Sequence, residues 1–240
     1  MSRTLKHDIP GVDWRRRPEC VRERVGEGLR ARAGALGWPE IFAPELSAPR
    51  RLVVDLGFGR GEFLMNLAAS EPDAGFLGIE VSSKRLLKMA RRLARSELCN
   101  VRLIESTAQR AVAELLPEGS VSCFWINFPD PWPKKRHHRR RLIDPDFVRD
   151  LAARLEPGGM VNIATDHLDY AEVADAVLAG EPGLENCYAP ERFRSEVPGR
   201  PQTAYEAEWR AEGRPLRFFS YARCKALQPS SPLDTPRAAS

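Results

Sequence analysis

The sequence predicts an α/β protein with a mostly parallel sheet and helices on both faces. Apolar runs of strand length alternate with segments of helical periodicity, and a glycine-rich turn follows the first run. Acidic residues stand at the ends of several of these runs. A strand, a helix and a second strand in succession form a parallel pair, and ligands bind beyond the carboxyl ends of such strands. We therefore expect one binding crevice at that edge of the sheet.

The alternation predicts the elements in order. The expected strands cover residues 51–56, 75–81, 100–104, 121–126, 160–164, 184–188 and 216–224. The expected helices cover residues 62–70, 82–95, 108–116, 145–155 and 169–179. Ser82 or Ser83 is expected to cap the second helix. Residues 157–159, Pro-Gly-Gly, are expected to form a tight turn, and residues 189–201 a polar loop.

Charge and turn residues divide the chain into three parts. Residues 1–48 are rich in arginine and show little apolar alternation, so we expect a basic extension, partly helical or flexible. It is either a loosely docked segment or a second contact for a polyanion. Residues 49–227 are expected to form the folded domain, and residues 228–240 a disordered tail.

Composition excludes several classes of protein. With 240 residues, 42% hydrophobic and 29% charged, the chain resembles an ordinary globular protein. No apolar run approaches the ~20 residues that cross a bilayer, and the first residues lack the apolar core of a signal peptide. The five cysteines include no CxxC pair, and the four histidines lack metal-ligand spacing. We expect a cytoplasmic protein with reduced thiols and no metal site.

The first expected strand leads into a candidate nucleoside site. Asp55 is followed by Gly57, Gly59 and Gly61, and glycines allow the backbone to approach a ligand beneath a helix N-terminus. Glu80, at the end of the next strand, stands about where an acid binds ribose hydroxyls. The spacing is not the GxGxxG of a dinucleotide site. It resembles the first motif of class I methyltransferases, which bind S-adenosylmethionine; a Rossmann-like protein for another ligand is the alternative.

Residues 127–141, NFPDPWPKKRHHRRR, join a rigid acidic turn to a run of cations. Asp130 lies between two prolines, each of which fixes its own φ and restricts the residue before it. Lys134–Arg141, here called the basic arm, contains six Lys or Arg residues and two His. The chain's net charge is +4 and the arm contributes +6, so the remainder carries 4 − 6 = −2. This local charge favours a nucleic-acid partner beside an active centre.

Taken together, these motifs closely resemble the tRNA (guanine-N7-)-methyltransferase family. The resemblance covers residues 38–226 and rests on FPDPWPKKRHHRRRL, DLGFGRGEFL, GIEV, ATDHLDYA and TAYEAEWRAEGRPLRFF. It implies a Rossmann-like class I methyltransferase fold with a mostly parallel seven-stranded sheet, S-adenosylmethionine as methyl donor and tRNA as substrate. It points to guanosine 46 in the variable loop, and to a chain that acts as a monomer or homodimer without an accessory subunit.

The resemblance also implies roles for single residues. The donor site would comprise Asp55, Gly57, Gly59, Glu80, Thr107 and Asp130, with Asp130 also the catalytic residue. The target nucleotide and its RNA would contact Lys134, Asp166, Thr203, Ala204, Tyr205 and Glu206. The arm would bind RNA through Lys135, Arg136, Arg139, Arg140 and Arg141. Thr107 departs from the family, which usually has Asp or Asn there, but a hydroxyl can still bond an adenine edge.

The chemistry suits these residue types. Guanine N7 carries a free lone pair, so no proton has to be removed before it attacks a sulfonium methyl, and no strong general base is required. The product base is cationic, and a carboxylate beside it would stabilise the developing charge. Asp130 is expected to hold the base while Asp166 completes the pocket.

Structural roles remain open for the same residues. Asp130 would alternatively cap its own turn, and Asp166 would alternatively be the N-cap of the next helix. Glu206 would alternatively pair with the basic arm, and Trp132 would pack against the turn rather than stack on a base.

Two other functions compete with this interpretation. A DNA or small-molecule methyltransferase is one, although the Asn/Asp-Pro-Pro-aromatic turn of amino-methylating DNA enzymes is absent. A non-catalytic RNA-binding module is the other. Such a module would tolerate the loss of the donor-site acids, yet Asp55 and Glu80 are both present.

Overall fold

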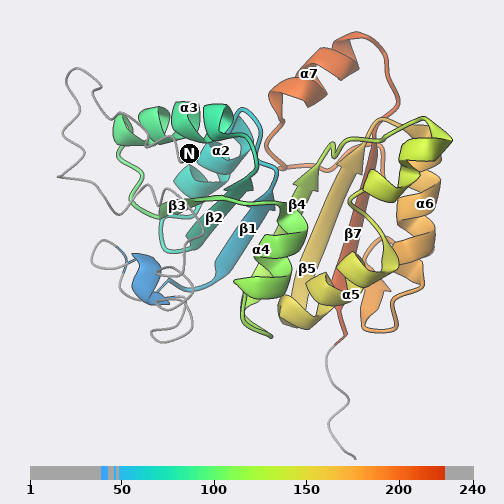
Figure 1. Cartoon of the computed structure of the whole chain (residues 1–240), viewed down its shortest axis with the longest axis horizontal. Coiled ribbons are helices and arrows are strands. Elements are labelled where there is room, and N and C mark those ends of the chain that lie inside the picture. Colours follow the sequence, from blue (N-terminus) through green and yellow to red (C-terminus); the bar gives the residue numbers. More distant parts are fainter. Residues whose placement is uncertain (1–38, 43–45, 47–48, 225–240) are drawn as a thin grey trace, which may run out of the picture.

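A computed structural model describes residues 39–42, 46 and 49–224. Most of the predicted basic extension, residues 1–48, and the predicted tail, residues 228–240, lie outside the described residues. In the described part, seven strands form one sheet in the order β3-β2-β1-β4-β5-β7-β6 (Figure 1). The strands are β1 Leu52–Leu56, β2 Gly75–Glu80, β3 Val101–Glu105, β4 Val121–Asn127, β5 Leu155–Thr165, β6 Leu184–Asn186 and β7 Arg217–Arg223.

The strand order places a crevice in the middle of the sheet. β1 pairs in parallel with both β2 and β4, so the chain order reverses between β1 and β4. The helices that follow these strands diverge at such a reversal, which leaves room for a ligand beyond the carboxyl ends. Only β7 runs against its neighbours β5 and β6 in this sheet of the described residues. The predicted mostly parallel seven-stranded sheet is thus confirmed.

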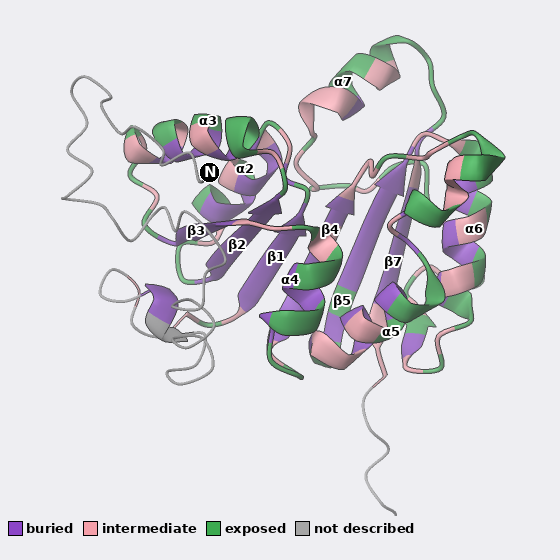
Figure 2. Cartoon of the chain, in the orientation of Figure 1, coloured by how far each residue is buried: buried purple, intermediate pink, exposed green. Residues whose placement is uncertain are grey.

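Helices cover both faces of the sheet because successive strand residues point to opposite sides. Val53 packs with the buried residues of two helices, and Val54 packs with those of three others. Figure 2 shows the strands buried between these layers. The first layer contains α2 Glu62–Ser70 and α3 Ser83–Ala94, and the second contains α4 Ala108–Glu114, α5 Pro145–Arg154 and α6 Leu168–Ala179. Ser82 caps α3, as predicted.

Three local features differ from the sequence-based expectations. α7, Ala204–Ala211, was not predicted, because Glu206 is its only buried residue and it has no apolar stripe. Residues 135–140 of the basic arm form a 3₁₀ helix, η3 Lys135–Arg140. The expected tight turn at residues 157–159 is instead a bulge within β5, where the pairing with β4 shifts between Val121 and Cys123.

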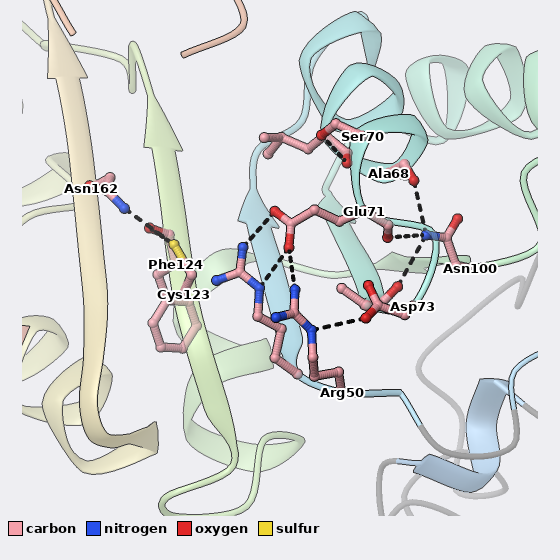
Figure 3. A network of polar contacts seen from close by, with 12 residues as sticks. Arg50, Ala68, Ser70, Glu71, Asp73, Asn100, Cys123, Phe124 and Asn162 are labelled. Carbon is pink, nitrogen blue, oxygen red and sulfur yellow. Dashed lines mark hydrogen bonds and ion pairs between the residues drawn. The ribbon is translucent and has the colours of Figure 1, made fainter. Parts of the chain in front are cut away.

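The amino edge of the sheet, opposite the crevice, is closed by paired polar groups (Figure 3). Arg51, just before β1, donates to Glu71 from Nε at 2.9 Å and from Nη2 at 2.6 Å. The Asn100 amide, just before β3, donates to the carbonyls of Ala68, Glu71 and Ala74 at 3.0, 3.0 and 3.1 Å. These bonds satisfy two carbonyls at the end of α2 and one in the turn before β2, and they fix that helix against the sheet.

No helix in the described part of the chain combines the length and the apolar character that a membrane crossing requires. Within the same residues, His, Cys, Asp and Glu form no cluster that could hold a metal ion.

Candidate active site

A cleft of about 410 Å³ opens at the carboxyl edge of the sheet. This volume lies in the range of small-molecule sites. Its walls come from the turn after β1, the segment after β4, the end of β5 and α7. The lining residues are Asp55, Gly57, Phe58, Gly59, Arg60, Glu62, Phe63, Arg85, Asn127, Phe128, Pro129, Asp130, Pro131, Asp166, His167, Thr203, Ala204, Tyr205, Trp209 and Arg214.

The cleft brings together most of the predicted donor and base contacts. The predicted residues that line it are Asp55, Gly57, Gly59, Asp130, Asp166, Thr203, Ala204 and Tyr205. Glu80, Thr107, Lys134 and Glu206 are not among its lining residues. The sequence-based prediction did not include Arg60, Arg85, Trp209 or Arg214, because isolated cations and aromatics carry no motif.

Asp55 is the most perturbed acid of the site. Its side chain is 1% exposed, and Oδ2 has no hydrogen-bond partner among the described residues. Burial raises the pKa of Asp55 to about 7; nearby Arg200 opposes the shift, and Glu80 adds to it. A buried carboxylate oxygen without a donor is costly in the ligand-free protein and is suited to a hydrogen-bonding or cationic ligand.

Glu80 holds the glycine turn in place. Its Oε2 accepts the amide of Gly59 at 3.1 Å, and its Oε1 accepts the amide of Ser82 at 2.9 Å. Gly57 and Gly59 have φ values of 79° and 59°, a region that side chains disfavour. A carboxylate has about four lone-pair sites. Glu80 therefore retains lone pairs that could accept hydrogen bonds from ribose hydroxyls while it holds the turn beside Asp55.

The segment around Asp130 has a strained backbone on both sides. Phe128 has φ 53° and Trp132 has φ 43°, values that are uncommon for residues with a Cβ. Phe128 is fixed by an edge-to-face contact with Trp209, with ring centroids 4.8 Å apart. Trp132 packs under Arg140, 5.0 Å from the ring centroid, as the packing interpretation expected. The Asp130 carboxylate itself is exposed and has no hydrogen bond to another described residue.

Asp166 is not a helix cap. The N-cap of α6 is His167, whose Nδ1 accepts the amide of Tyr170 at 3.3 Å. Asp166 instead accepts from Arg214 Nη1 at 3.3 Å. The alternative role that the sequence left open is therefore wrong, and the carboxylate of Asp166 faces the cleft beside a cation from the other wall.

Arg200 connects the two walls behind the cleft, and no sequence motif indicated it. Its side chain is 3% exposed, and its guanidinium donates to Glu206 of α7 and to Asn127 Oδ1 at the end of β4. It also lies 4.9 Å from the ring centroids of both Phe63 and Phe218. Because an arginine only donates, the Asn127 oxygen must face it, which leaves the Asn127 Nδ2 buried without a partner at the cleft wall.

Glu206 was expected either to contact RNA or to pair with the basic arm, and the structure contradicts both roles. The side chain is 3% exposed, and its Oε1 accepts from Arg210 at 3.1 Å while Oε2 accepts from Arg200. A carboxylate that is buried between two guanidinium groups stays paired there, because separation would leave uncompensated charge in the interior. Glu206 therefore anchors α7 to the sheet.

The basic arm divides into exposed and buried cations. Lys134, Lys135, Arg136, Arg139 and Arg140 are all exposed. Arg141, predicted to bind RNA with them, is 5% exposed and donates to the carbonyl of Pro131 at 2.9 Å and to Asp169. Its charge is used to hold the arm against α6, so it is not available for a phosphate.

Thr107 lies outside the cleft. It is the N-cap of α4, and its hydroxyl accepts the amide of Arg110 at 3.3 Å. The side chain is exposed at the end of β3. The structure thus gives Thr107 a capping role and does not bring it to the lining of the cleft.

The comparisons with known proteins identify the family of the chain. Residues 49–218 match a family described as "Putative methyltransferase". The tRNA (guanine-N(7)-)-methyltransferase of Alkalilimnicola ehrlichii is 43% identical over 176 residues, 73% of either chain. Its Geobacter metallireducens counterpart is 34% identical over 188 residues, 78% of this chain and 89% of the relative. That of Thermotoga maritima is 41% identical over 180 residues, 75% of this chain and 55% of the relative.

The chain belongs to the tRNA (guanine-N7-)-methyltransferase family. Solved structures extend the likeness at the level of the fold. The 16S rRNA methyltransferase KamB gives a TM-score of 0.57 at 18% identity, with 78% of this chain and 94% of that chain covered. A 16S rRNA (adenine-N1)-methyltransferase mutant with its cosubstrate, from Catenulisporales acidiphilia, gives 0.55 at 18% identity, with 80% and 94% covered. The family's Rossmann-like fold, predicted from the sequence, is confirmed.

The residues of the cleft fit S-adenosylmethionine, the donor expected from the sequence. The orphaned Oδ2 of Asp55 can accept from a cationic or N–H group of the ligand. A Cβ added at Gly57 would meet no atom within 4 Å, so open space lies above the turn. At Gly61 a Cβ would lie 2.3 Å from Met89 Sδ, so this glycine is required for packing of the turn on α3.

Proposed function

We propose that this protein transfers the methyl group of S-adenosylmethionine to N7 of a guanosine in tRNA. The products are 7-methylguanosine and S-adenosylhomocysteine. The observation that carries the proposal is one cleft in which Asp55, Asp130 and Asp166 converge beside an exposed basic arm. The membership of the family supports the same reaction. By analogy with the resemblance stated above, the modified nucleotide is guanosine 46 of the variable loop.

Asp55 and Glu80 hold the donor side. When bound, S-adenosylmethionine supplies an electrophilic methyl group on a cationic sulfur. Asp55 provides a buried acceptor for the donor's cationic or N–H groups, and Glu80 provides acceptors for hydroxyls while it fixes the glycine turn. The donor is thereby oriented before RNA binds.

Asp130 and Asp166 bind the target base and stabilise its developing charge. Guanine N7 attacks with a lone pair that it already has, so the protein removes no proton before transfer. Positive charge moves onto the base as the new bond forms, and the Asp130 carboxylate stabilises that charge. The carboxylates can also accept from the base N1–H and amino group, which favours guanine over adenine. Arg214 keeps Asp166 oriented toward the cleft.

The basic arm supplies affinity for the RNA backbone. Lys134, Lys135, Arg136, Arg139 and Arg140 are exposed next to the Asp130 turn. Contacts to phosphates position a substrate without reading its sequence. The protein is proposed to act in the cytoplasm, as a monomer or homodimer, without an accessory subunit.

A methyl-transfer assay tests the proposal. Purified protein is incubated with S-adenosylmethionine carrying a labelled methyl group and with tRNA that lacks modifications, and the RNA is collected on a filter. Label in tRNA and none in duplex DNA is the expected result. Reduction and aniline cleavage then locate 7-methylguanosine. Label in DNA would favour the DNA methyltransferase alternative, and RNA binding without any label would favour the non-catalytic module.

A further inference from the structure

One face of α3 carries a stripe of cations that the sequence motifs did not include. Lys84, Lys88, Arg91 and Arg95 follow one another at intervals of four, three and four residues, so they lie on one side of the helix. All four are exposed. At 1.5 Å per residue, the row is about 16 Å long. We call these four residues the α3 stripe.

The α3 stripe is not neutralised within the protein. None of its four cations has an ion-pair or hydrogen-bond partner for its side chain among the described residues, and α3 contains no acidic residue. The exposed arginines of α4 and α5, by contrast, do have partners. Arg110 of α4 pairs with Glu114 at 2.9 Å, and Arg149 of α5 pairs with Asp146 at 2.8 Å.

This arrangement does not favour the helix itself. Like charges four residues apart repel each other, as Lys84 and Lys88 do, and Lys84 also stands in the first turn, where the helix dipole disfavours a cation. A polyanion along the stripe would remove the repulsion. The unpaired row is therefore explained by a ligand better than by the stability of the helix.

The α3 stripe starts at the cleft. α3 begins where β2 ends, at the carboxyl edge, and Arg85 from its first turn lines the cleft. Arg85 also donates to the hydroxyl of Tyr205 in α7, across the cleft, at 3.4 Å. Figure 1 shows α3 extending away from α7 along the outside of the sheet. A chain that leaves the cleft on this side would follow the stripe.

We propose that the α3 stripe binds the phosphodiester backbone of the tRNA substrate, outside the nucleotide that enters the cleft. The inference rests on the proposed function and adds a second backbone contact. The basic arm holds the RNA on the wall that contains Asp130, and the stripe holds it on the donor wall. Lysine and arginine side chains in a row contact successive phosphates without selecting bases.

The chemistry of α3 favours RNA over an anionic membrane. A helix that binds at a membrane surface inserts an apolar face. The apolar residues of α3, which include Leu86, Met89 and Leu93, are buried against the sheet. The exposed residues of α3 are Ser83, Lys84, Arg85, Lys88 and Arg91, all of them polar or charged, and this suits a soluble polyanion.

A charge-matched pair of variants tests the proposal in the full chain. K88Q/R91Q removes two cations from the α3 stripe, and R110Q/R149Q removes two exposed cations from α4 and α5. Both lower the net charge by two, so an effect of overall charge is the same in each. Binding of unmodified tRNA, without donor, is measured across a salt titration for both variants and wild type, and circular dichroism verifies folding.

K88Q/R91Q is expected to lower tRNA affinity about tenfold and to reduce the slope of log affinity against log salt by about 1.4–1.8. R110Q/R149Q is expected to match wild type. A wild-type slope for K88Q/R91Q, or an equal loss in both variants, would overturn the inference. So would normal tRNA binding combined with lost binding to phosphatidylserine vesicles. If wild type binds tRNA but transfers no methyl group, the proposed reaction fails while the stripe is still tested by binding.

Discussion

The two edges of the central sheet differ in whether their buried polar groups are hydrogen-bonded within the protein. At the amino edge, Asn100 uses its amide to bond three carbonyls, and Arg51 forms two bonds with Glu71 (Figure 3). At the carboxyl edge, Asp55 Oδ2 and Asn127 Nδ2 are buried without partners. Because unpaired buried groups reduce stability, the amino edge supports the fold and the carboxyl edge keeps its bonding capacity for ligands. The following predictions test this division.

Asp130→Ala tests the carboxyl edge with the largest expected effect. The turnover number should fall by about 10²–10³, the range for removing one electrostatic group from a reaction centre. Donor affinity and the melting temperature should stay at wild-type values, because the Asp130 carboxylate is exposed. Single-turnover kinetics and calorimetric titration with S-adenosylmethionine measure these quantities. Asp146→Ala, on the surface of α5, is the control, and wild-type turnover in Asp130→Ala would remove this residue from the mechanism.

Arg200→Met should show that the carboxyl edge contains one structural ion pair. The change leaves Glu206 buried with only Arg210, and loss of one partner from a buried pair costs about 3 kcal/mol of unfolding free energy. Burial already lowers the pKa of Arg200 against the raising effect of Glu206. Urea unfolding measures the loss. Arg149→Met, which breaks an exposed pair, should cost at most about 1 kcal/mol; equal costs would contradict the role of Arg200.

Asn100→Ala tests the amino edge. Three carbonyls lose their donor, and we expect the unfolding free energy to fall by about 1–3 kcal/mol. Below the melting temperature, the Kd for the donor and the turnover number should not change, because the site lies at the other edge. Asn186→Ala, which removes an exposed bond to the Glu191 carbonyl and a bond accepted from the Tyr188 amide, is the control for loss of asparagine side-chain bonds away from this edge. Reduced donor affinity in folded Asn100→Ala would mean that the edges are coupled.

The titration of Asp55 should make donor binding depend on pH. Burial raises the pKa of Asp55 to about 7 from the ordinary 3.8 of an aspartate, so its contribution to stability is complete below pH 4 and is lost as the pH rises through 7. A cationic donor requires the ionised carboxylate of Asp55, so the affinity for the donor increases as the pH rises through 7. The Kd should be about tenfold higher at pH 6 than at pH 8. Calorimetric titration at both values measures this, and Asp55→Asn should abolish the difference; a persistent difference would assign it to another group.

The smallest effects concern the basic arm. K134Q/R139Q removes two exposed cations and should reduce the salt slope of tRNA affinity by about 1.4–1.8 with no loss of stability. Arg141→Gln should lower the stability of the protein and leave the salt slope of tRNA affinity unchanged, because the Arg141 guanidinium is bonded to Pro131 and Asp169. Filter binding and thermal unfolding distinguish the two variants. Unchanged affinity of K134Q/R139Q across the titration would argue against the arm as an RNA contact.

The sequence predicted the parts of the molecule that local patterns determine. The strands, the five large helices and a crevice at the carboxyl edge follow from periodicity and from the rule for parallel sheets. Of the four strand-end residues expected to converge there, Asp55 and Asp130 line the cleft, whereas Glu80 and Thr107 do not. The sequence did not distinguish Arg141 from the neighbouring cations of the arm, because burial depends on α6, which packs there only in the folded chain. Arg200 was missed for the same reason, since its partner Asn127 is 73 positions away.

The order of the strands sets the moment at which the site can form. β5 pairs with β7 at the end of the described chain, and α7, which closes the cleft, immediately precedes β7. A nascent chain that has emerged only as far as α6 contains Asp55, Glu80, Asp130 and Asp166 but has neither the Arg200 bridge nor the last wall. A domain generally folds as a unit during synthesis. The incomplete polypeptide on the ribosome is therefore expected to be inactive toward the tRNAs that surround it until α7 and β7 have emerged and folded onto the sheet.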